Sequence, residues 1–242
     1  PIIGCEVYVA ARTRFDKDPE RDRGMFHLIL LAENMTGYKN LTKIVSIGFT
    51  EGFYFKPRVD KEVLREHSEG IICLSACLAG AIPRKILGGD YSGAEAEAIE
   101  LQEIFGKDNF FLEIQNHFLD EDKAVTEGLV RLAKEIGAPL VATNDAHYIK
   151  RSDAKAHDVL LAIQTGTTVD DENRMRFAND EFYLKDESEM FSLFPDLPEA
   201  IENTHRVAER CNVEFEFGNY HLPEFISPGG LTNREYLRQL CY

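Results

Sequence analysis

The stretch TNDAHY, residues 143–148, places a carboxylate and an imidazole two residues apart, directly after the apolar run PLVA. Alternate residues of an extended chain point to the same side, so Asp145 and His147 could reach one metal ion, or two ions roughly 3.5–4 Å apart. A carboxylate beside an imidazole suits Zn, Mn or Fe. The alternative is a polar turn in which Asp145 caps the following segment and His147 is exposed. The residues alone leave both interpretations open.

Three other side chains have a comparable placement. Glu6 lies inside an apolar run, where an unpaired carboxylate is costly and needs a cation or hydrogen-bond partners. His27 opens the run HLILLA, and Cys77 follows the run IICLS. Taken singly, this histidine is more typical of a satisfied core or edge residue, and this cysteine of a buried, inert thiol. His117 follows a further apolar run and is a candidate for a position near the site.

Competing chemistries have no motif to support them. The sequence contains no G-x-S-x-G elbow, Walker loop, G-x-G-x-x-G or C-x-x-C pair. Lys56 and Arg58, in the stretch FYFKPR, could touch phosphate, but a structural ion pair is the simpler interpretation.

The elements that must position these residues alternate along the chain. Short apolar runs alternate with amphipathic segments of period 3.6, which is typical of parallel α/β architecture, whether barrel-like or open. The predicted strands are Ile2–Ala10, Phe26–Ala32, Gly70–Leu74, Asn109–Gln115 and Pro139–Thr143. The clearest predicted helices are Glu121–Ile136 and the apolar stripes that end at Phe105 and at Cys211, and two further helices are predicted at Thr36–Ile47 and Lys155–Ile163. Ligand-binding residues of such folds collect at the carboxyl ends of strands, where Cys77 and Asp145 are predicted to lie.

Composition excludes several classes of protein. The chain has 242 residues, 44% of them hydrophobic, and no apolar run approaches the ~18–20 residues of a membrane span, so no membrane partner is expected. Five scattered cysteines predict a reducing, cytoplasmic location rather than a disulfide scaffold. The net charge of -15 argues against this chain alone binding a phosphate backbone through bulk electrostatics.

Read together, the segments resemble the PHP (polymerase and histidinol phosphatase) domain of the bacterial DNA polymerase III alpha subunit. The matching stretches run in the family's order over nearly the whole chain: PIIGCEVYVA, FHLILLAENMTGYKNL, EGFYFKPRVD, LSACLAGAIPRKI, TNDAHY, FANDEFYLK, NTHRVAERCNVE and HLPEF. The resemblance implies a distorted (β/α) barrel with divalent metals at its strand ends. The ligands that it implies here are Glu6, His27, Cys77, Asp145 and His147, and no catalytic residue beyond these ligands is assigned.

In active members the resemblance implies metal-dependent phosphodiester hydrolysis, that is, a 3′–5′ exonuclease that can proofread. In other members the domain is catalytically silent, stabilises the polymerase and docks a separate exonuclease subunit. The parent protein would be a DNA-directed DNA polymerase of chromosome replication that uses Mg, with DNA, the exonuclease subunit and the sliding clamp as partners. A stand-alone PHP phosphoesterase is a further alternative, which the continuation of the chain beyond residue 217 disfavours.

The sequence also departs from the family. An H-x-H motif, an Asp and a T-D-H segment of the family's opening strands would lie upstream of Pro1 and are not in this chain. We therefore expect residues 1–217 to form a PHP domain that lacks its first strands, with weak metal binding and no efficient catalysis. A linker over residues 218–230, rich in Pro and Gly, and the start of the polymerase palm region over residues 231–242 are expected to follow.

Overall fold

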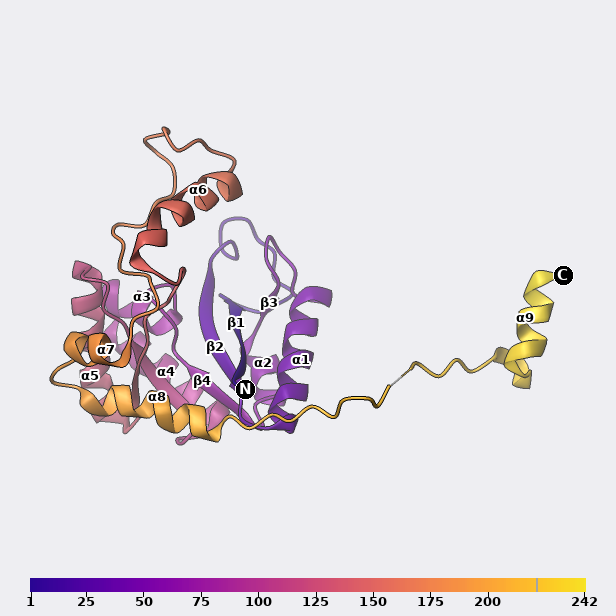
Figure 1. The fold of residues 1–242 in the computed structure, drawn as a ribbon. Helices are drawn as coiled ribbons and strands as arrows, with labels where there is room; N and C mark the ends of the chain where they lie inside the picture. Colours follow the sequence, from indigo (N-terminus) through magenta and orange to yellow (C-terminus); the bar gives the residue numbers. More distant parts are fainter. Residues whose placement is uncertain (221) are drawn as a thin grey trace.

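A computed structural model describes residues 1–220 and 222–242 of the chain. Six strands form one sheet in the order β3-β1-β2-β4-β5-β6 (Figure 1). The strands are β1 (Ile3–Ala10), β2 (Met25–Ala32), β3 (Arg58–Val59), β4 (Ile71–Leu74), β5 (Phe110–Ile114) and β6 (Leu140–Ala142). Five of them lie where apolar runs predicted strands.

Helices fill most of the connections between the strands. They are α1 (Met35–Thr50), α2 (Lys61–Glu66), α3 (Ala81–Leu87), α4 (Tyr91–Phe105), α5 (Asp120–Ile136), α6 (Ala154–Thr165), α7 (Glu187–Leu193), α8 (Pro198–Arg210) and α9 (Asn233–Cys241). The predicted helices correspond to α1, α5 and α6, and the apolar stripes that end at Phe105 and Cys211 correspond to α4 and α8. Helix α1 begins where the side chain of Asn34 accepts a hydrogen bond from the backbone of Gly37, and α5 ends at Gly137 in the left-handed conformation that glycine adopts freely.

The sheet is mixed, so the expectation of parallel strands was wrong for part of it. Strand β2 runs antiparallel to both β1 and β4, whereas β1 with β3, β4 with β5, and β5 with β6 are parallel. The physical reason is the connection from β1 to β2. It holds no long helix that could carry the chain back across the sheet, so the two strands pair as a long hairpin.

The sheet is open. Among the described residues the outer strands β3 and β6 do not pair with each other, so this structure contains an α/β sheet and not a closed barrel. Strand β3 was not predicted, because a two-residue strand carries no readable alternation.

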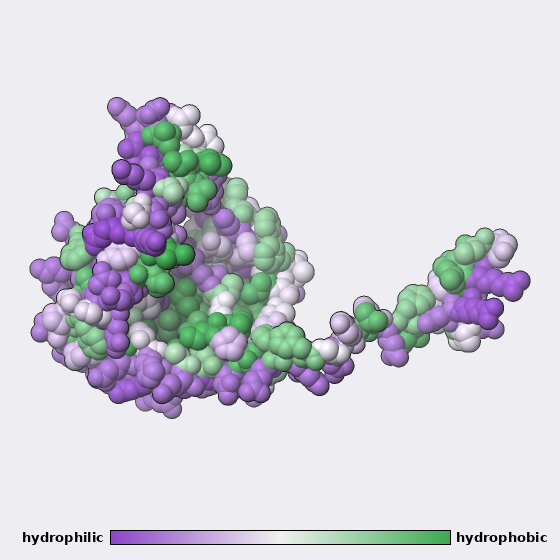
Figure 2. All heavy atoms as spheres, viewed as in Figure 1, coloured by the Kyte–Doolittle hydropathy of each residue, from purple (hydrophilic) through white to green (hydrophobic). Residues whose placement is uncertain are grey.

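The two faces of the sheet are covered unequally. One face packs on α1 to α5 and forms the main core, with Leu30, Ile44, Phe110 and Leu129 among its buried residues. On the other face a smaller cluster includes Val207 of α8 and Cys211, the residue that follows this helix. Figure 2 shows a hollow at the centre of this region, with apolar residues at its base. The candidate ligands from β1 and β2 lie on this second, less covered face.

The chain leaves the sheet region after α8. Residues 211–220 and 222–227 form no helix or strand, and none of the residues of α9 is buried (Figure 1). His221, which belongs to the HLPEF stretch and to the predicted linker, lies outside the described residues. None of the helices in the described part of the chain is long and apolar enough to cross a membrane.

Candidate metal centre

The pairing of β1 with β2 brings the first two predicted ligands together. Glu6 is opposite Ile29, and Tyr8 is opposite His27. Residues that face each other in a sheet share a face, and so do residues two apart on one strand, so Glu6, Tyr8 and His27 all point to the same side. The ring of Tyr8 packs edge-on against that of His27, with 5.1 Å between the ring centroids.

His27 contacts two other predicted ligands through one ring nitrogen. Its Nδ1 lies 3.2 Å from Oε1 of Glu6 and 3.7 Å from Sγ of Cys77. The loop after β4 delivers Cys77 to this position, because the backbone N–H of His27 donates to the carbonyl of Ala79. Contacts with Cys77 and Glu6 raise the pKa of His27 to about 9, and the contact with His27 lowers the pKa of Glu6.

Glu6 does not lie in the environment that was expected for it. Its run is apolar, but its side chain is 37% exposed, because this residue points to the open face of the sheet. Glu6 is therefore not the buried carboxylate that its apolar run predicted. Its neighbour Val7, on the opposite face, is buried in the core.

The second pair of predicted ligands follows β6. Asp145 has a φ of 46°, so the chain is not extended here and the alternation argument does not apply. The loop instead folds back, and Nδ1 of His147 donates to the carbonyl of Asp145 over 2.7 Å, with a carboxylate oxygen of Asp145 at 3.9 Å. A carbonyl oxygen can only accept, so Nδ1 carries a proton in this bond, and Nε2 of His147 is the ring nitrogen left for a metal ion. Asp145 caps neither of the helices that follow, whose N-caps are Lys150 and Asp153.

Aromatic side chains hold the ring of His147. Its centroid lies 4.7 Å from that of Phe177, 5.6 Å from that of His157 and 5.8 Å from that of Phe182. These residues come from α6 and from the segment that follows it. The ring therefore has a fixed orientation although its side chain is 37% exposed.

Electrostatics links the two pairs. The charge of His147 contributes to the lowered pKa of Glu6, so these side chains lie within electrostatic range although they belong to β1 and to the loop after β6. In residues 1–220 and 222–242, however, no three or more His, Cys, Asp or Glu side chains are arranged to hold a metal ion as they stand. The structure therefore brings Glu6, His27 and Cys77 into contact and Asp145 and His147 into contact, and neither group completes a coordination shell among the described residues.

The donor set nevertheless fits a divalent ion. Two ligand atoms on a tetrahedral zinc ion, with bonds of 2.0–2.3 Å, are separated by roughly 3.3–3.6 Å. The distances from His27 to Glu6 and to Cys77 lie close to that range. An imidazole, a thiolate and a carboxylate are ligands that Zn, Mn and Fe sites use in different proportions.

A buried carboxylate that sequence reasoning missed lies beside this region. Glu113 of β5 is buried, and its Oε1 accepts hydrogen bonds from Gln115 and Thr143, whereas its Oε2 has no partner among the described residues. Burial raises the pKa of Glu113 to about 6, and the charge of Asp145 contributes. The available signal was a single Glu within the apolar run FFLEI.

His117 supports the loop that carries Asp145. It is buried, its Nε2 donates to the carbonyl of Asn144 over 2.8 Å, and its ring stacks on Phe182 at 4.1 Å. Lys185 bonds the side chain of Asn144 from the other side. His117 therefore touches the neighbour of a predicted ligand rather than the ligands themselves.

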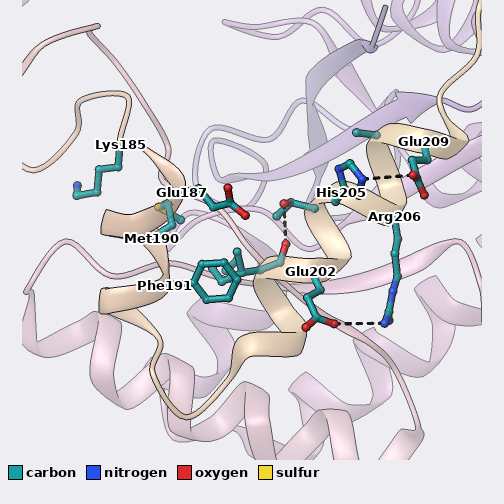
Figure 3. Close-up of a pocket in the computed structure, with 12 residues that line it drawn as sticks. Lys185, Glu187, Met190, Phe191, Glu202, His205, Arg206 and Glu209 are labelled. Atoms are coloured by element: carbon teal, nitrogen blue, oxygen red, sulfur yellow. Dashed lines mark hydrogen bonds and ion pairs between the residues drawn. The ribbon is translucent and has the colours of Figure 1, made fainter.

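The cavity drawn in Figure 3 lies elsewhere. It has a volume of about 830 Å³ between α7 and α8, and its lining includes Lys185, Phe191 and His205, where His205 pairs with Glu209. None of the five predicted ligands lines it. The cavity and the candidate metal centre are separate features of the described structure.

Comparison with known proteins identifies the region that holds Glu6, His27 and Cys77. Residues 1–117 match the PHP domain. This chain carries a PHP domain. All of the chain also aligns with proteins named DNA polymerase III subunit alpha: it is 48% identical to that of Thermus aquaticus, 47% to that of Treponema pallidum and 45% to that of Deinococcus radiodurans.

These alignments cover 20%, 21% and 19% of the three relatives. The chain thus spans about a fifth of the length of the relatives that it matches. The predicted resemblance is confirmed, and the PHP match ends at His117, close to the end of β5. The Asp145 and His147 loop lies beyond that match but within the part that aligns with the alpha subunits.

Proposed function

We propose that this chain is the PHP module of a DNA polymerase III alpha subunit, and that Glu6, His27, Cys77, Asp145 and His147 hold divalent metal at one mouth of its sheet. The observation that carries the proposal is the meeting of Glu6, His27 and Cys77. They come from β1, β2 and the loop after β4, yet a single nitrogen of His27 contacts both partners.

Each side chain has a part that follows from its contacts. His147 would offer Nε2, because its Nδ1 already donates to Asp145 and the aromatic side chains around it fix the ring. His27 would offer Nδ1 once its bonds to Glu6 and Cys77 give way to bonds with the ion. A bound Zn, Mn or Fe ion activates water and stabilises charge on a phosphate oxygen. Glu113 would hold the base of the Asp145 loop through Thr143.

For the whole protein we propose DNA-directed DNA synthesis in chromosome replication, with Mg at the polymerase site. Its partners would be DNA, an exonuclease subunit and the sliding clamp. The relatives' names support this proposal. Residues 1–217 would be the PHP module, residues 218–230 a linker and residues 231–242 the start of the palm region. The open edges of the sheet leave room for further strands that would close it into a barrel.

The activity we propose for the metal centre is phosphodiester hydrolysis in the 3′–5′ direction. The alternative is a silent module that stabilises the polymerase and docks the exonuclease subunit. One observation favours the alternative: His27 is already satisfied by Glu6 and Cys77, which is also the arrangement of a structural ion pair.

Metal titration of the full 242-residue chain separates the two. We expect the wild type to bind cobalt with a thiolate-to-cobalt charge-transfer band in the near ultraviolet, which Cys77→Ser removes. Asp145→Ala combined with His147→Ala should lower the cobalt affinity while the far-ultraviolet circular dichroism stays unchanged. Cys73→Ser, which changes a buried cysteine of β4 on the helix-covered face, is the control and should keep the band.

Two results would decide against the metal centre. Binding of no cobalt, zinc or manganese by the wild type would support the silent module. Binding that the Asp145 and His147 changes leave untouched would show that the ligands were wrongly assigned. In the whole polymerase, the same double change should abolish hydrolysis of the 3′ end.

A further inference from the structure

Two loops beside the candidate metal centre form a surface that the proposed function does not use. We call residues 11–24 and 51–58 together the aromatic–basic patch. All three of its phenylalanines are exposed: Phe15 is 59%, Phe53 is 50% and Phe55 is 63% exposed. Large aromatic side chains bury substantial area when they have something to pack against. Three exposed phenylalanines in adjacent loops therefore indicate a surface that meets a partner.

Arg58 joins the two loops into one body. Its side chain is completely buried, and it donates to the carbonyls of Arg14, Asp16, Asp22 and Gly52. The first three carbonyls belong to one loop, and the fourth belongs to the other. Arg58 therefore fixes the two loops relative to each other, and the exposed phenylalanines of the patch extend from loops of defined conformation.

The cations of the patch are available to a ligand. Lys17, Arg21, Arg23 and Lys56 are exposed and form no ion pair with the described residues. The guanidinium of Arg23 lies over the ring of Phe55 at 5.9 Å. Several of the nearby acids are already occupied: Arg12 pairs with Asp16 and Asp22, and Arg14 pairs with Glu51.

The local charge contrasts with that of the chain. The two loops contain seven Lys and Arg residues against five Asp and Glu residues, whereas the net charge of the whole chain is -15. The unengaged acids within the loops include Glu20, and Asp18 accepts backbone bonds from Glu20 and Arg21. An anionic ligand would therefore meet a local excess of positively charged side chains close to the exposed rings.

Phe55 occupies a backbone conformation that an L residue adopts at a cost. Its φ is 61°, at the tip of a tight turn in which the backbone N–H of Tyr54 donates to the carbonyl of Lys56. A left-handed backbone conformation is strained for any residue other than glycine, and such residues cluster at functional sites. A glycine would avoid this cost, yet the position holds an aromatic ring that points to solvent.

The patch opens next to the candidate metal centre. Arg58 of β3 pairs with Tyr8 of β1, so their side chains share a face of the sheet. Tyr8 in turn packs against His27 with the ring centroids 5.1 Å apart. The loops also lie side by side beyond the same end of β1 (Figure 1). Only Tyr8 therefore lies between Arg58, which supports the patch, and the predicted ligand His27.

We propose that the aromatic–basic patch binds single-stranded nucleic acid. Bases stack on the exposed phenylalanines, and phosphates pair with the four unpaired cations. Every base has a face that can stack on an aromatic ring, so this recognition does not depend on sequence. A strand bound here lies alongside the metal centre, and in this respect the inference rests on the proposed function. Binding itself requires no metal.

The test measures binding without hydrolysis. Fluorescence anisotropy of a labelled single-stranded DNA of about 12 nucleotides, at low salt and with EDTA present, reports the affinity of the full 242-residue chain. We expect Phe53→Ala with Phe55→Ala to weaken binding roughly tenfold or more. Lys56→Glu should weaken it too and flatten the salt dependence.

Two matched controls exclude trivial causes. Phe118 is 66% exposed with a φ of 60°, but it lies beside the acidic start of α5, so Phe118→Ala should leave the affinity unchanged. Lys107 is an exposed lysine outside the patch, so Lys107→Glu changes the net charge equally and should have a much smaller effect than Lys56→Glu.

Three outcomes would overturn the patch as a nucleic-acid site. They are no binding by the wild type, equal effects of the patch and control variants, and equal affinity for a duplex, which cannot stack on the rings. Equal effects of the patch and control variants, or equal affinity for a duplex, would show that bulk charge alone causes the binding. No binding by the wild type would indicate that the exposed rings contact a protein neighbour instead. If DNA binding depends on the patch but no metal binds, the proposed metal function fails and the patch stands.

Discussion

A single buried side chain, Arg58, fixes two loops that have no regular secondary structure to hold them. Its four carbonyl partners would lose their donors if the guanidinium were removed, and an unsatisfied buried polar group costs about 1–3 kcal/mol. We expect Arg58→Met to lower the free energy of unfolding by about 3–5 kcal/mol in urea denaturation. Arg65→Met, which removes a largely exposed contact with Glu100, should change it by less than about 1 kcal/mol.

Equal effects of the two changes would show that the loops are held by something other than Arg58. The sequence pointed to a structural role for this residue, and the role is structural. Its partners are backbone carbonyls and not a carboxylate, however. That distinction could not be predicted, because it depends on how the loop 11–24 folds over β3.

Glu113 gives the folded protein a dependence on pH whose sign is fixed by its burial. Its pKa is raised to about 6, above the ordinary value of 4.5, so between these pH values the folded state binds more protons than the unfolded state. Stability from this group is therefore lost as the pH rises from 4.5 through 6, and the loss amounts to about 2 kcal/mol by pH 7.

Glu113→Gln should remove this slope, because the amide oxygen still accepts from Thr143 and Gln115 but no longer titrates. The comparison requires urea denaturation in EDTA at several pH values between 4 and 7.5. Parallel stability curves for the wild type and the variant would show that the carboxyl is not titrating in this range. A buried carboxylate of this kind could have been suspected from its apolar run, as Glu6 was, although Glu6 proved to lie on the open face.

At the scale of elements, close backbone contact fixes the start of α1. A Cβ added to Gly37 would lie 1.8 Å from the carbonyl oxygen of Gly70, which is backbone and cannot rotate away. We expect Gly37→Ala to destabilise the fold by about 2–4 kcal/mol, although alanine favours helices, because α1 must shift from the turn before β4. Gly24→Ala is the control, since nothing lies within 4 Å of its Cβ.

The measurement is again urea denaturation, and a stable Gly37→Ala variant would show that α1 can move without cost. Elements with clear sequence patterns were predictable. The predicted bounds of α5, β1 and β4 each lie within two residues of the observed bounds. Short elements such as β3 and α2 were not predicted. Their formation depends on contacts with β1 and α4, which lie far away in sequence.

At the scale of the whole molecule, the sequence predicted which strand ends carry the candidate ligands, but it did not predict the directions of all the strands. Apolar runs followed by polar residues indicated where Cys77 and Asp145 would lie, because strand ends collect at an edge in any α/β order. The antiparallel pairing of β2 depends on the route of residues 11–24, which no periodicity encodes. The same pairing places Glu6 and His27 on one face. The contact between Glu6 and His27 therefore depends on a strand direction that the sequence did not predict.

The boundary predicted after residue 217 can be tested by shortening the chain. No residue of α9 is buried, and the buried side chain of Ser227 bonds only Asn233, which belongs to the same tail. Ending the chain after Phe217 should therefore leave the melting temperature unchanged, since no core contact is lost. Removing exposed Leu237 and Leu240 should also reduce any self-association seen by light scattering.

Ending the chain after Phe194 provides the contrast. That cut removes α8, whose buried Ile201 and Val207 join the two core clusters, and burial of each such side chain contributes about 1.5–3 kcal/mol. This shorter chain should lose cooperative unfolding. A fall in melting temperature already at Phe217 would mean that residues 218–242 pack on the sheet region, and the boundary would then have to be placed elsewhere.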